Sequence, residues 1–325
     1  MRRFGVLGVI AVVGLAVTGI GAQQRPRIPP TGSIKHVRDN LYVIPGAGGN
    51  TTVFVTASGV VLVDTKLANN GEAILNQVRT VTDKPVSMII NTHSHPDHIG
   101  SNDYFPASVE KVTHENARKW IGANVQYASN PAIMPTKTFT DKTTLGSGKD
   151  RIDLYYFGPG HTNGDTWVVF PTLRALCIGD LMAWKMAPLI DPAAGGSVIA
   201  LPDTLEKAMR GIKNVDTVIE GHGDVNTWDG FREYTQFNRA LLDAAKAGLG
   251  KQTPEAIAAS LKPKFPTFTK EELLPDLEYG GTPLSRAIIN VNVAFQELRG
   301  EPVTTNFGPR AGAPPPASSA PLPGR

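Results

Sequence analysis

Three of the chain's seven histidines and one aspartate fall within six residues, at His93, His95, Asp97 and His98. They follow the apolar run 86–90, which is typical of a buried strand, so they lie where that strand runs out into a loop. His93 and His95 are two residues apart and point to the same side of extended backbone, where both imidazoles can bind one ion. Asp97 and His98 come after a proline, where the chain must turn, and can face a second ion. Imidazole and carboxylate together suit zinc, with iron or manganese as alternatives.

The alternative for this motif is a polar turn whose histidines bind nothing. Four ligand-type side chains in six positions leave few residues free for packing, which favours the metal site. A metal site also needs ligands from elsewhere in the chain. His161 lies in a glycine-rich turn after an apolar strand, and Asp180 and His222 each come just past another one. Glycines let the backbone approach an ion closely, and layered folds place their sites at strand ends.

With these motifs in this order, roughly residues 38–225 resemble the metallo-β-lactamase superfamily. The resemblance implies an α+β fold, a four-layer αβ/βα sandwich of two mixed sheets with helices outside and a two-metal site at one edge. It implies that Asp64, at an early strand end, orients ligands from behind. It also implies two Zn²⁺ per chain, the first held by His93, His95 and His161, the second by Asp97, His98 and His222, with Asp180 bridging them.

Two adjacent divalent ions lower the pKa of a shared water towards about 7, hold it as hydroxide and stabilise the oxyanion formed on attack. Asp97 would orient that hydroxide as the catalytic carboxylate, and no serine or cysteine nucleophile is required. The sequence therefore predicts a zinc-dependent hydrolase acting on a small-molecule ester, lactone, thioester or amide, a β-lactam included. Sulfate and phosphate bonds fall in the same reaction class.

Two other functions compete with this one. An iron-dependent redox enzyme of the persulfide dioxygenase type binds one metal, whereas the second ligand set is complete here. Flavodiiron proteins carry glutamate where this chain has His95. A non-enzymatic metal-binding protein is disfavoured because degenerate members usually lose ligands.

Cys177 lies three residues before Asp180, within the predicted strand, and is expected to pack in the core. Some β-lactamases of the superfamily bind their second metal through a cysteine at the position of Asp180. The Gly-Asp ending here resembles instead the glyoxalase II, lactonase and ribonuclease-like branches. The Gly-His-Thr-Asn-Gly-Asp run at 160–165 resembles secreted class B β-lactamase-like proteins.

Trp184 and Lys185 follow Asp180 closely and could form part of a substrate pocket, as an apolar face and a cation. The alternative for Lys185 is a solvated surface lysine. Among the other polar residues, His114 is expected to cap or pack at a helix start, Asp165 to serve a turn, and His36 to be exposed.

Strands and helices alternate along the chain, which predicts a layered architecture. The region 123–137 is polar and reads as a surface loop, and 138–145 reads as one short strand. The expected divisions are a signal peptide at 1–22, a leader at 23–37, the catalytic domain at 38–225, a C-terminal helical extension at 226–307 and a disordered tail at 308–325.

Residues 1–22 carry two arginines before an apolar run, which predicts export to the periplasm or medium. A retained membrane anchor is the alternative, and after cleavage no stable membrane association is expected. Cleavage takes the formal charge from +3 to +1, so charge gives no reason to expect a nucleic-acid partner. A single cysteine excludes an intrachain disulfide. The sequence does not indicate an oligomeric state.

Overall fold

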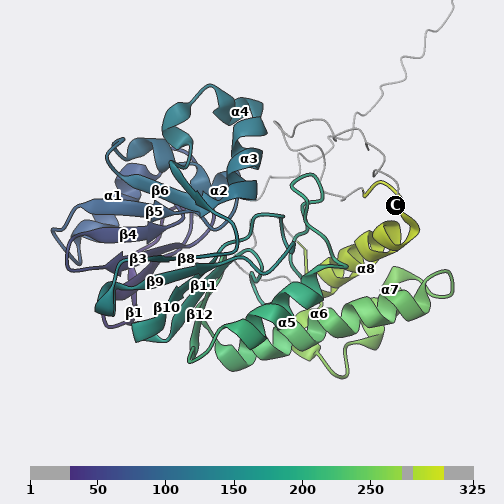
Figure 1. The fold of residues 1–325 in the computed structure, drawn as a ribbon. Coiled ribbons are helices and arrows are strands. Elements are labelled where there is room, and N and C mark those ends of the chain that lie inside the picture. Colours follow the sequence, from purple (N-terminus) through teal and green to yellow (C-terminus); the bar gives the residue numbers. More distant parts are fainter. Residues whose placement is uncertain (1–29, 273–280, 304–325) are drawn as a thin grey trace, which may run out of the picture.

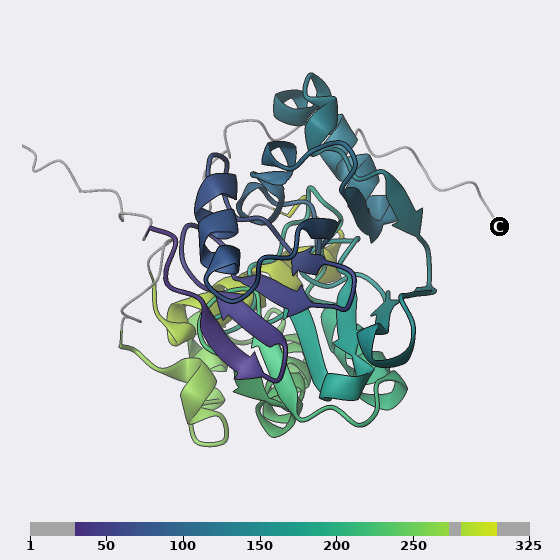
Figure 2. The same ribbon diagram turned by 90° about the vertical axis from the view of Figure 1, so that its left-hand side faces the viewer.

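The computed structural model describes residues 30–272 and 281–303. Two β-sheets pack face to face, with helices on the outer side of each (Figure 1). Turned by 90°, the molecule shows its blue and teal helices above the sheets and its green helices below them (Figure 2). The predicted α+β fold, a four-layer αβ/βα sandwich, is confirmed.

The first sheet contains seven strands, which lie side by side in chain order. They are β1 (Lys35–Arg38), β2 (Leu41–Ile44), β3 (Thr51–Val55), β4 (Val60–Val63), β5 (Val86–Ile90), β6 (Glu110–His114) and β7 (Lys137–Phe139). β1 to β4 pair antiparallel, and β4 to β7 pair parallel. Because β4 and β5 are parallel neighbours, Asp64 and the motif at 91–100 leave the sheet at the same edge.

The second sheet contains six strands in the order β13-β12-β11-β10-β9-β8. Their bounds are β8 (Lys142–Leu145), β9 (Ile152–Tyr155), β10 (Trp167–Phe170), β11 (Ala175–Gly179), β12 (Thr217–Glu220) and β13 (Asn226–Thr227). Only β11 and β12 pair parallel, and they too end together. The carboxyl ends of β11 and β12 carry Asp180 and His222.

The single strand predicted at 138–145 is wrong. The chain forms β7 in the first sheet and β8 in the second, and Thr140 and Asp141 carry it across. The Thr140 carbonyl accepts a hydrogen bond from Nε2 of His114, and the Asp141 carbonyl accepts one from the amide of Tyr156. Nδ1 of His114 caps α3, as expected. Short strands in different sheets each have a buried face, so hydrophobic pattern alone cannot separate them from one longer strand.

Helices cover the outer faces of both sheets. Those next to the first sheet are α1 (Gly71–Arg79), α2 (Pro96–Ile99), α3 (Glu115–Ala123) and α4 (Val125–Ala128). Those next to the second are α5 (Leu201–Gly211), α6 (Trp228–Gly248), α7 (Pro254–Ser260) and α8 (Pro283–Arg299). α8 begins with a capping box formed by Thr282 and Ser285 and ends at Gly300 in the left-handed region. Among residues 30–272 and 281–303, no helix combines the length and the apolar character that a membrane crossing requires.

Apolar side chains from both sheets form the central layer of the core. Phe54 of β3 meets Phe170 of β10 edge to face, with 5.1 Å between the ring centroids. Cys177 lies in this layer, as expected for a core residue. At its rim, Asp216 binds Arg38 of β1 at 2.7 Å and Arg174 at 2.8 Å, which ties the two sheets together on the surface.

Two further segments differ from the sequence predictions. β1 falls largely within the stretch predicted as a leader, and His36 is exposed on it. The region 123–137 is not a structureless loop: it forms α4 and a 3₁₀ turn at Pro131–Ile133. Its Tyr127 and Ile133 pack against Ile99 of the motif, which ties this polar-looking region to the core. The predicted signal peptide and C-terminal tail lie outside the described residues.

The segment that follows β13 packs on the second sheet through α6, α7 and α8. Hydrogen bonds also join it to the region 181–199. The Tyr234 hydroxyl donates to the Leu181 carbonyl at 2.7 Å, and the Asn290 amide donates to the Pro188 carbonyl at 3.1 Å. The C-terminal helices therefore touch the loop that follows Asp180.

Candidate metal centre

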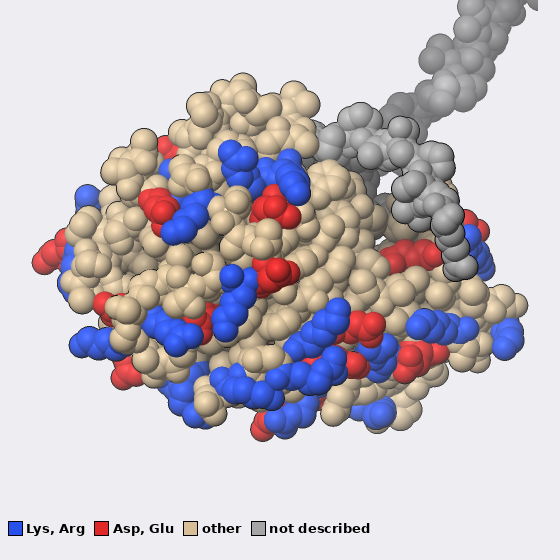
Figure 3. All heavy atoms as spheres, viewed as in Figure 1, with Lys and Arg blue, Asp and Glu red and all other residues tan. Residues whose placement is uncertain are grey.

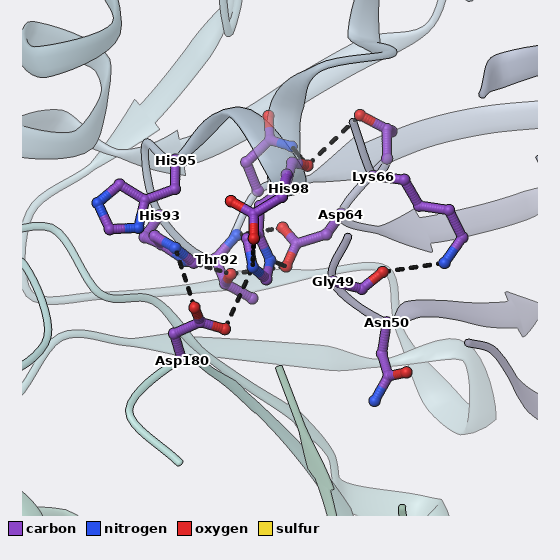
Figure 4. Close-up of polar contacts among 12 residues, drawn as sticks. Gly49, Asn50, Asp64, Lys66, Thr92, His93, His95, His98 and Asp180 are labelled. Atoms are coloured by element: carbon purple, nitrogen blue, oxygen red, sulfur yellow. Dashed lines mark hydrogen bonds and ion pairs between the residues drawn. The ribbon is translucent and has the colours of Figure 1, made fainter. Parts of the chain in front are cut away.

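The seven predicted ligand residues meet at one edge of the sandwich, where strands of both sheets end. In Figure 4, His93 and His98 of the first sheet point towards Asp180 of the second. The first sheet supplies the residues after β5, namely His93, His95, Asp97 and His98. The second sheet supplies His161 after β9, Asp180 after β11 and His222 after β12. All seven side chains are buried.

The first cluster joins His93, His95, His161 and Asp180, whose ligand-type atoms lie within 4.8 Å of one another. His95 Nδ1 and His161 Nε2 are 2.9 Å apart. Asp180 Oδ2 lies 3.7 Å from His161 Nε2 and 3.9 Å from His93 Nε2. Three imidazoles and one carboxylate oxygen thus converge on one point.

The second cluster joins Asp97, His98, His222 and Asp180. His98 Nε2 and His222 Nε2 lie 3.2 and 3.4 Å from Asp180 Oδ1 and 3.4 Å from each other. Asp97 Oδ2 lies 3.3 Å from His222 Nε2. Asp180 therefore turns one oxygen to each cluster, in the position of a bridging carboxylate.

The spacing fits divalent cations. Ligand atoms around a tetrahedral zinc ion with bonds of about 2.0–2.1 Å lie about 3.3 Å apart. The contacts within the two clusters run from 2.9 to 3.9 Å. His93 Nε2 is buried and makes no hydrogen bond within the described part of the chain, although such an unsatisfied atom costs about 1–3 kcal/mol. A bound cation would satisfy this atom.

Glycine is required beside both clusters. A side chain at Gly49 would overlap the imidazole of His98, and one at Gly221 would overlap the carboxylate of Asp180. The backbone at these two positions therefore packs directly against candidate ligands.

Asp64 fixes two of the histidines from behind. Its carboxylate accepts the Thr92 amide, the Thr92 hydroxyl and His98 Nδ1, each at 2.7 Å. Because the Thr92 hydroxyl donates to Asp64, it can accept from His93 Nδ1 at 3.0 Å. With their Nδ1 atoms occupied, His93 and His98 turn Nε2 towards the clusters.

The other two histidines of the first cluster are held by one loop. His161 Nδ1 donates to the carbonyl of Leu189. His95 Nε2 lies 2.8 Å from Asp191 Oδ2. These contacts leave His161 Nε2 and His95 Nδ1 to face the first cluster.

The two clusters set buried carboxylates beside buried histidines, and each shifts the pKa of the other. Burial, helped by positive charge on nearby histidines, lowers the pKa of His93 well below 6.5. Burial opposes charge on His98 and His222, but Asp180 outweighs it and raises the pKa of His98 well above 6.5 and that of His222 to about 9. Burial likewise opposes ionisation of Asp97 and Asp180, yet the neighbouring histidines hold the pKa of both carboxyls below 3.8. Both carboxylates are therefore ionised at neutral pH.

Trp184 and Lys185 occupy the two central positions of a tight turn bridged by Ala183 and Met186, and both have a φ of 52°. The Trp184 ring stacks on His222, with 4.2 Å between centroids. Lys185 is exposed. The described contacts bring Trp184 to the second cluster but join the Lys185 ammonium to neither cluster.

Sequence reasoning missed Lys66, which is fully buried beside the site (Figure 4). Its ammonium donates to the carbonyls of Ile44, Gly46 and Gly49 at 2.7, 2.8 and 2.9 Å. All three carbonyls lie on or next to the β2–β3 turn, residues 45–50. A lone lysine after a strand offers no sequence signal for this role, because its three partners are carbonyls about 20 residues away.

The β2–β3 turn in turn contacts both sides of the site. The amide of Gly49 donates to the carbonyl of Asp97 at 3.0 Å. The backbone amide of Asn50 donates to the Gly221 carbonyl at 2.7 Å, and its side chain donates to the carbonyls of Glu220 and Gly223 at 3.0 Å. Lys66 therefore anchors a turn that links residues next to Asp97 with residues next to His222.

Comparison with known proteins identifies the family. The model described as "Metallo-beta-lactamase superfamily" matches residues 44–222. The chain is 26% identical over 247 residues to a metallo-beta-lactamase type 2 from Elizabethkingia meningoseptica, covering 70% of this chain and 96% of that protein. It is also 26% identical over 226 residues to a metallo-beta-lactamase type 2 from Bacteroides fragilis, covering 66% and 88%.

Solved structures agree on the fold. The stereoselective inverting sec-alkylsulfatase Pisa1 from Pseudomonas sp. aligns with a TM-score of 0.63 at 15% identity, covering 82% of this chain and 50% of that one. The present chain thus spans half the length of the alkylsulfatase. The DIM-1 metallo-beta-lactamase aligns with a TM-score of 0.52 at 18% identity, covering 66% of this chain and 99% of that one.

The sandwich and its two adjoining His/Asp clusters define a metal-dependent hydrolase. The chain belongs to the metallo-β-lactamase superfamily, whose model spans more than half of it.

Proposed function

We propose that this hydrolase binds two zinc ions and cleaves an ester, lactone, thioester or amide bond of a small molecule. The observation that carries the proposal is Asp180, which presents one carboxylate oxygen to each of two complete ligand clusters. Bound there, a pair of divalent ions supplies a hydrolytic nucleophile at neutral pH and polarises the bond that breaks.

The protein's own residues divide into three groups in this proposal. His93, His95 and His161 would hold the first metal, Asp97, His98 and His222 would hold the second, and Asp180 would serve both. Asp97 is the catalytic carboxylate, because its Oδ2 is ionised and faces the second cluster, where it can orient the attacking group. Asp64 orients His98 through a short hydrogen bond.

Trp184 is proposed to form an apolar wall for the substrate, since its ring covers His222. Trp184→Ala is expected to raise KM with little change in metal content. A role for Lys185 in binding anionic substrates stays a prediction from the sequence. If it binds them, Lys185→Ala lowers kcat/KM by about 10- to 150-fold for anionic substrates only, the value of one charge-assisted hydrogen bond. If Lys185→Ala changes kcat/KM equally for charged and neutral substrates, Lys185 does not bind the substrate's charge.

β-Lactams belong in the substrate set because the relatives that match most of this chain are named metallo-beta-lactamase type 2. The second cluster here offers nitrogen and oxygen donors only. Cys177 is buried in the core, and burial raises the pKa of its thiol to about 12, so it is protonated at neutral pH. Esters, lactones and thioesters therefore stand beside β-lactams as substrates to test.

Two measurements test the proposal. Elemental analysis of the active protein should find two zinc ions per chain, and a panel of β-lactam, lactone, thioester, ester and phosphodiester substrates should show which bond is cleaved. His95→Ala should abolish that activity, whereas His36→Ala, at an exposed position on β1, should retain it. One iron and no zinc in fully active protein would contradict the zinc assignment and favour the redox alternative.

Export is proposed on the sequence of residues 1–22 alone. The mature protein should begin near residue 23 and work outside the cytoplasm, in the periplasm or the medium. N-terminal sequencing of protein from native cells decides this, and an intact Met1 on cytoplasmic protein is the contrary result.

A further inference from the structure

A carboxylate outside the two clusters holds His95. Asp191 Oδ2 lies 2.8 Å from His95 Nε2, and the two side chains are 21% and 5% exposed. On the opposite side of the same ring, His95 Nδ1 lies 2.9 Å from His161 Nε2. Because the two ring nitrogens point in opposite directions, a hydrogen bond at Nε2 fixes where Nδ1 points.

Asp191 belongs to a stretch that touches two of the three histidines of the first cluster. Its backbone amide donates to the His161 carbonyl at 2.9 Å, and Leu189, two residues earlier, accepts from His161 Nδ1. Asp191 is itself held locally. Its carbonyl accepts the amides of Ala194 and Gly196, at 3.1 and 2.8 Å. The stretch 189–196 therefore forms a hydrogen-bonded support behind the first cluster.

The C-terminal helix α8 fastens this support. Oε2 of Glu297 accepts the Ser197 hydroxyl at 2.6 Å, and Oε1 accepts the Val198 amide at 2.8 Å. About two turns earlier on the same helix, Asn290 donates to the Pro188 carbonyl at 3.1 Å. α8 thus forms hydrogen bonds with the chain both before and after Asp191. Only the folded molecule brings these groups together, since Glu297 and Asp191 are over 100 residues apart in the sequence.

We propose that Asp191 is a positioning residue that sets the tautomer and orientation of His95 for the first metal, and that Glu297 of α8 keeps Asp191 in place. This inference rests on the proposed two-metal site but not on any substrate. A carboxylate behind a metal-binding histidine typically strengthens metal affinity by 10- to 100-fold. Asp64 supports His98 of the second cluster directly, and it reaches His93 of the first only through the Thr92 hydroxyl.

The test measures metal affinity at the two sites separately, by zinc competition against a fluorescent chelator. Asp191→Ala should lower the zinc affinity of the first site by about 10- to 100-fold. The zinc affinity of the second site should stay within about threefold of the wild-type value. Asp191→Asn keeps an acceptor for His95 Nε2 and should fall between that variant and the wild type. Asp203→Asn, an exposed carboxylate on α5, is the matched control and should behave as wild type.

A spectroscopic measurement separates positioning from general loosening. Nitrogen NMR of the histidine rings should report a proton on His95 Nε2 in the wild-type protein and a mixture of tautomers in Asp191→Ala. Glu297→Gln should weaken the first site in the same direction but less, and Glu301→Gln, an exposed residue just past α8, should not. Equal weakening of both sites, or an unchanged His95 tautomer, would overturn the proposal.

The outcome is independent of the proposed reaction. If the wild-type protein binds zinc but cleaves none of the substrates, the function proposed above fails, while the affinity and tautomer data still decide the role of Asp191. If hydrolysis is found and Asp191→Ala binds both metals normally, the role of Asp191 fails alone.

Discussion

Replacing Lys66 by methionine should lower the free energy of unfolding more than most core substitutions do. The ammonium of Lys66 donates to three backbone carbonyls at 2.7–2.9 Å from a fully buried position. Hydrogen bonds from a charged donor are worth about 1.5–3 kcal/mol each, but the variant also avoids burying a charge. We expect a net loss of about 3–5 kcal/mol in the free energy of unfolding, because three carbonyls each lose their donor at about 1–3 kcal/mol and the avoided burial of a charge offsets part of that loss.

Urea unfolding of the zinc-free and zinc-loaded proteins measures this loss. Lys84→Met is the matched control, because Lys84 is exposed and donates to a single carbonyl, that of Thr56, at 2.6 Å. It should cost less than about 1 kcal/mol. Lys66→Met should also weaken the second metal site, because the β2–β3 turn that it anchors contacts the backbone of Asp97. If the free energy of unfolding of Lys66→Met lies within about 1 kcal/mol of the wild-type value, the three carbonyl contacts do not stabilise the turn.

Three further predictions address the metal site and the rim of the sheets. Asp64→Ala should lower the affinity of the second metal by about 10- to 100-fold, because His98 loses its support; unchanged affinity in chelator competition would refute this. Cys177→Ser should keep both metals and cost about 1–2 kcal/mol in urea unfolding, whereas loss of the second metal with the fold intact would make Cys177 a ligand. Hydrogen bonds from its two arginine partners lower the pKa of Asp216 to about 2, so its stabilisation is complete above the ordinary value near 3.8 and disappears as the pH falls through 2. Because this carboxylate is 42% exposed, Asp216→Asn should lower the free energy of unfolding by only about 0.5–1 kcal/mol at neutral pH and by nothing near pH 2. If the variant and the wild type differ in stability by the same amount at every pH, the ionised carboxylate is not the source of the stabilisation.

The parts of the fold that sequence predicted best are those with a strong local signal. The strand predicted at 86–90 forms β5 at those residues, directly before the proline-containing motif. The seven candidate ligands could be found because each has a chemically distinctive side chain just past an apolar run. Their convergence at one edge follows from two pairs of parallel strands, β4 with β5 and β11 with β12.

The parts that sequence did not predict depend on distant partners. β7 and β8 read as one strand because pattern does not say which sheet a strand joins. β1 is recognisable only through its pairing with β2, since half of its residues are exposed. In the sequence, Asp191 is an ordinary aspartate before a proline, and its contact with His95 appears only in the structure. Lys66 is likewise an ordinary loop lysine until the structure places three carbonyls beside its ammonium. Supporting residues of this kind carry ordinary local sequences, so only the tertiary structure reveals them.

All strands of the first sheet precede Thr140 and Asp141 in the sequence, and all strands of the second sheet follow this crossover. His93, His95, Asp97 and His98 precede it, and His161, Asp180 and His222 follow it. Neither cluster can therefore form within one half of the chain. Metal binding in such a site contributes directly to holding the two halves together. A chain divided at this crossover would behave as a pair of complementary fragments, whose association zinc would promote and a chelator would reverse.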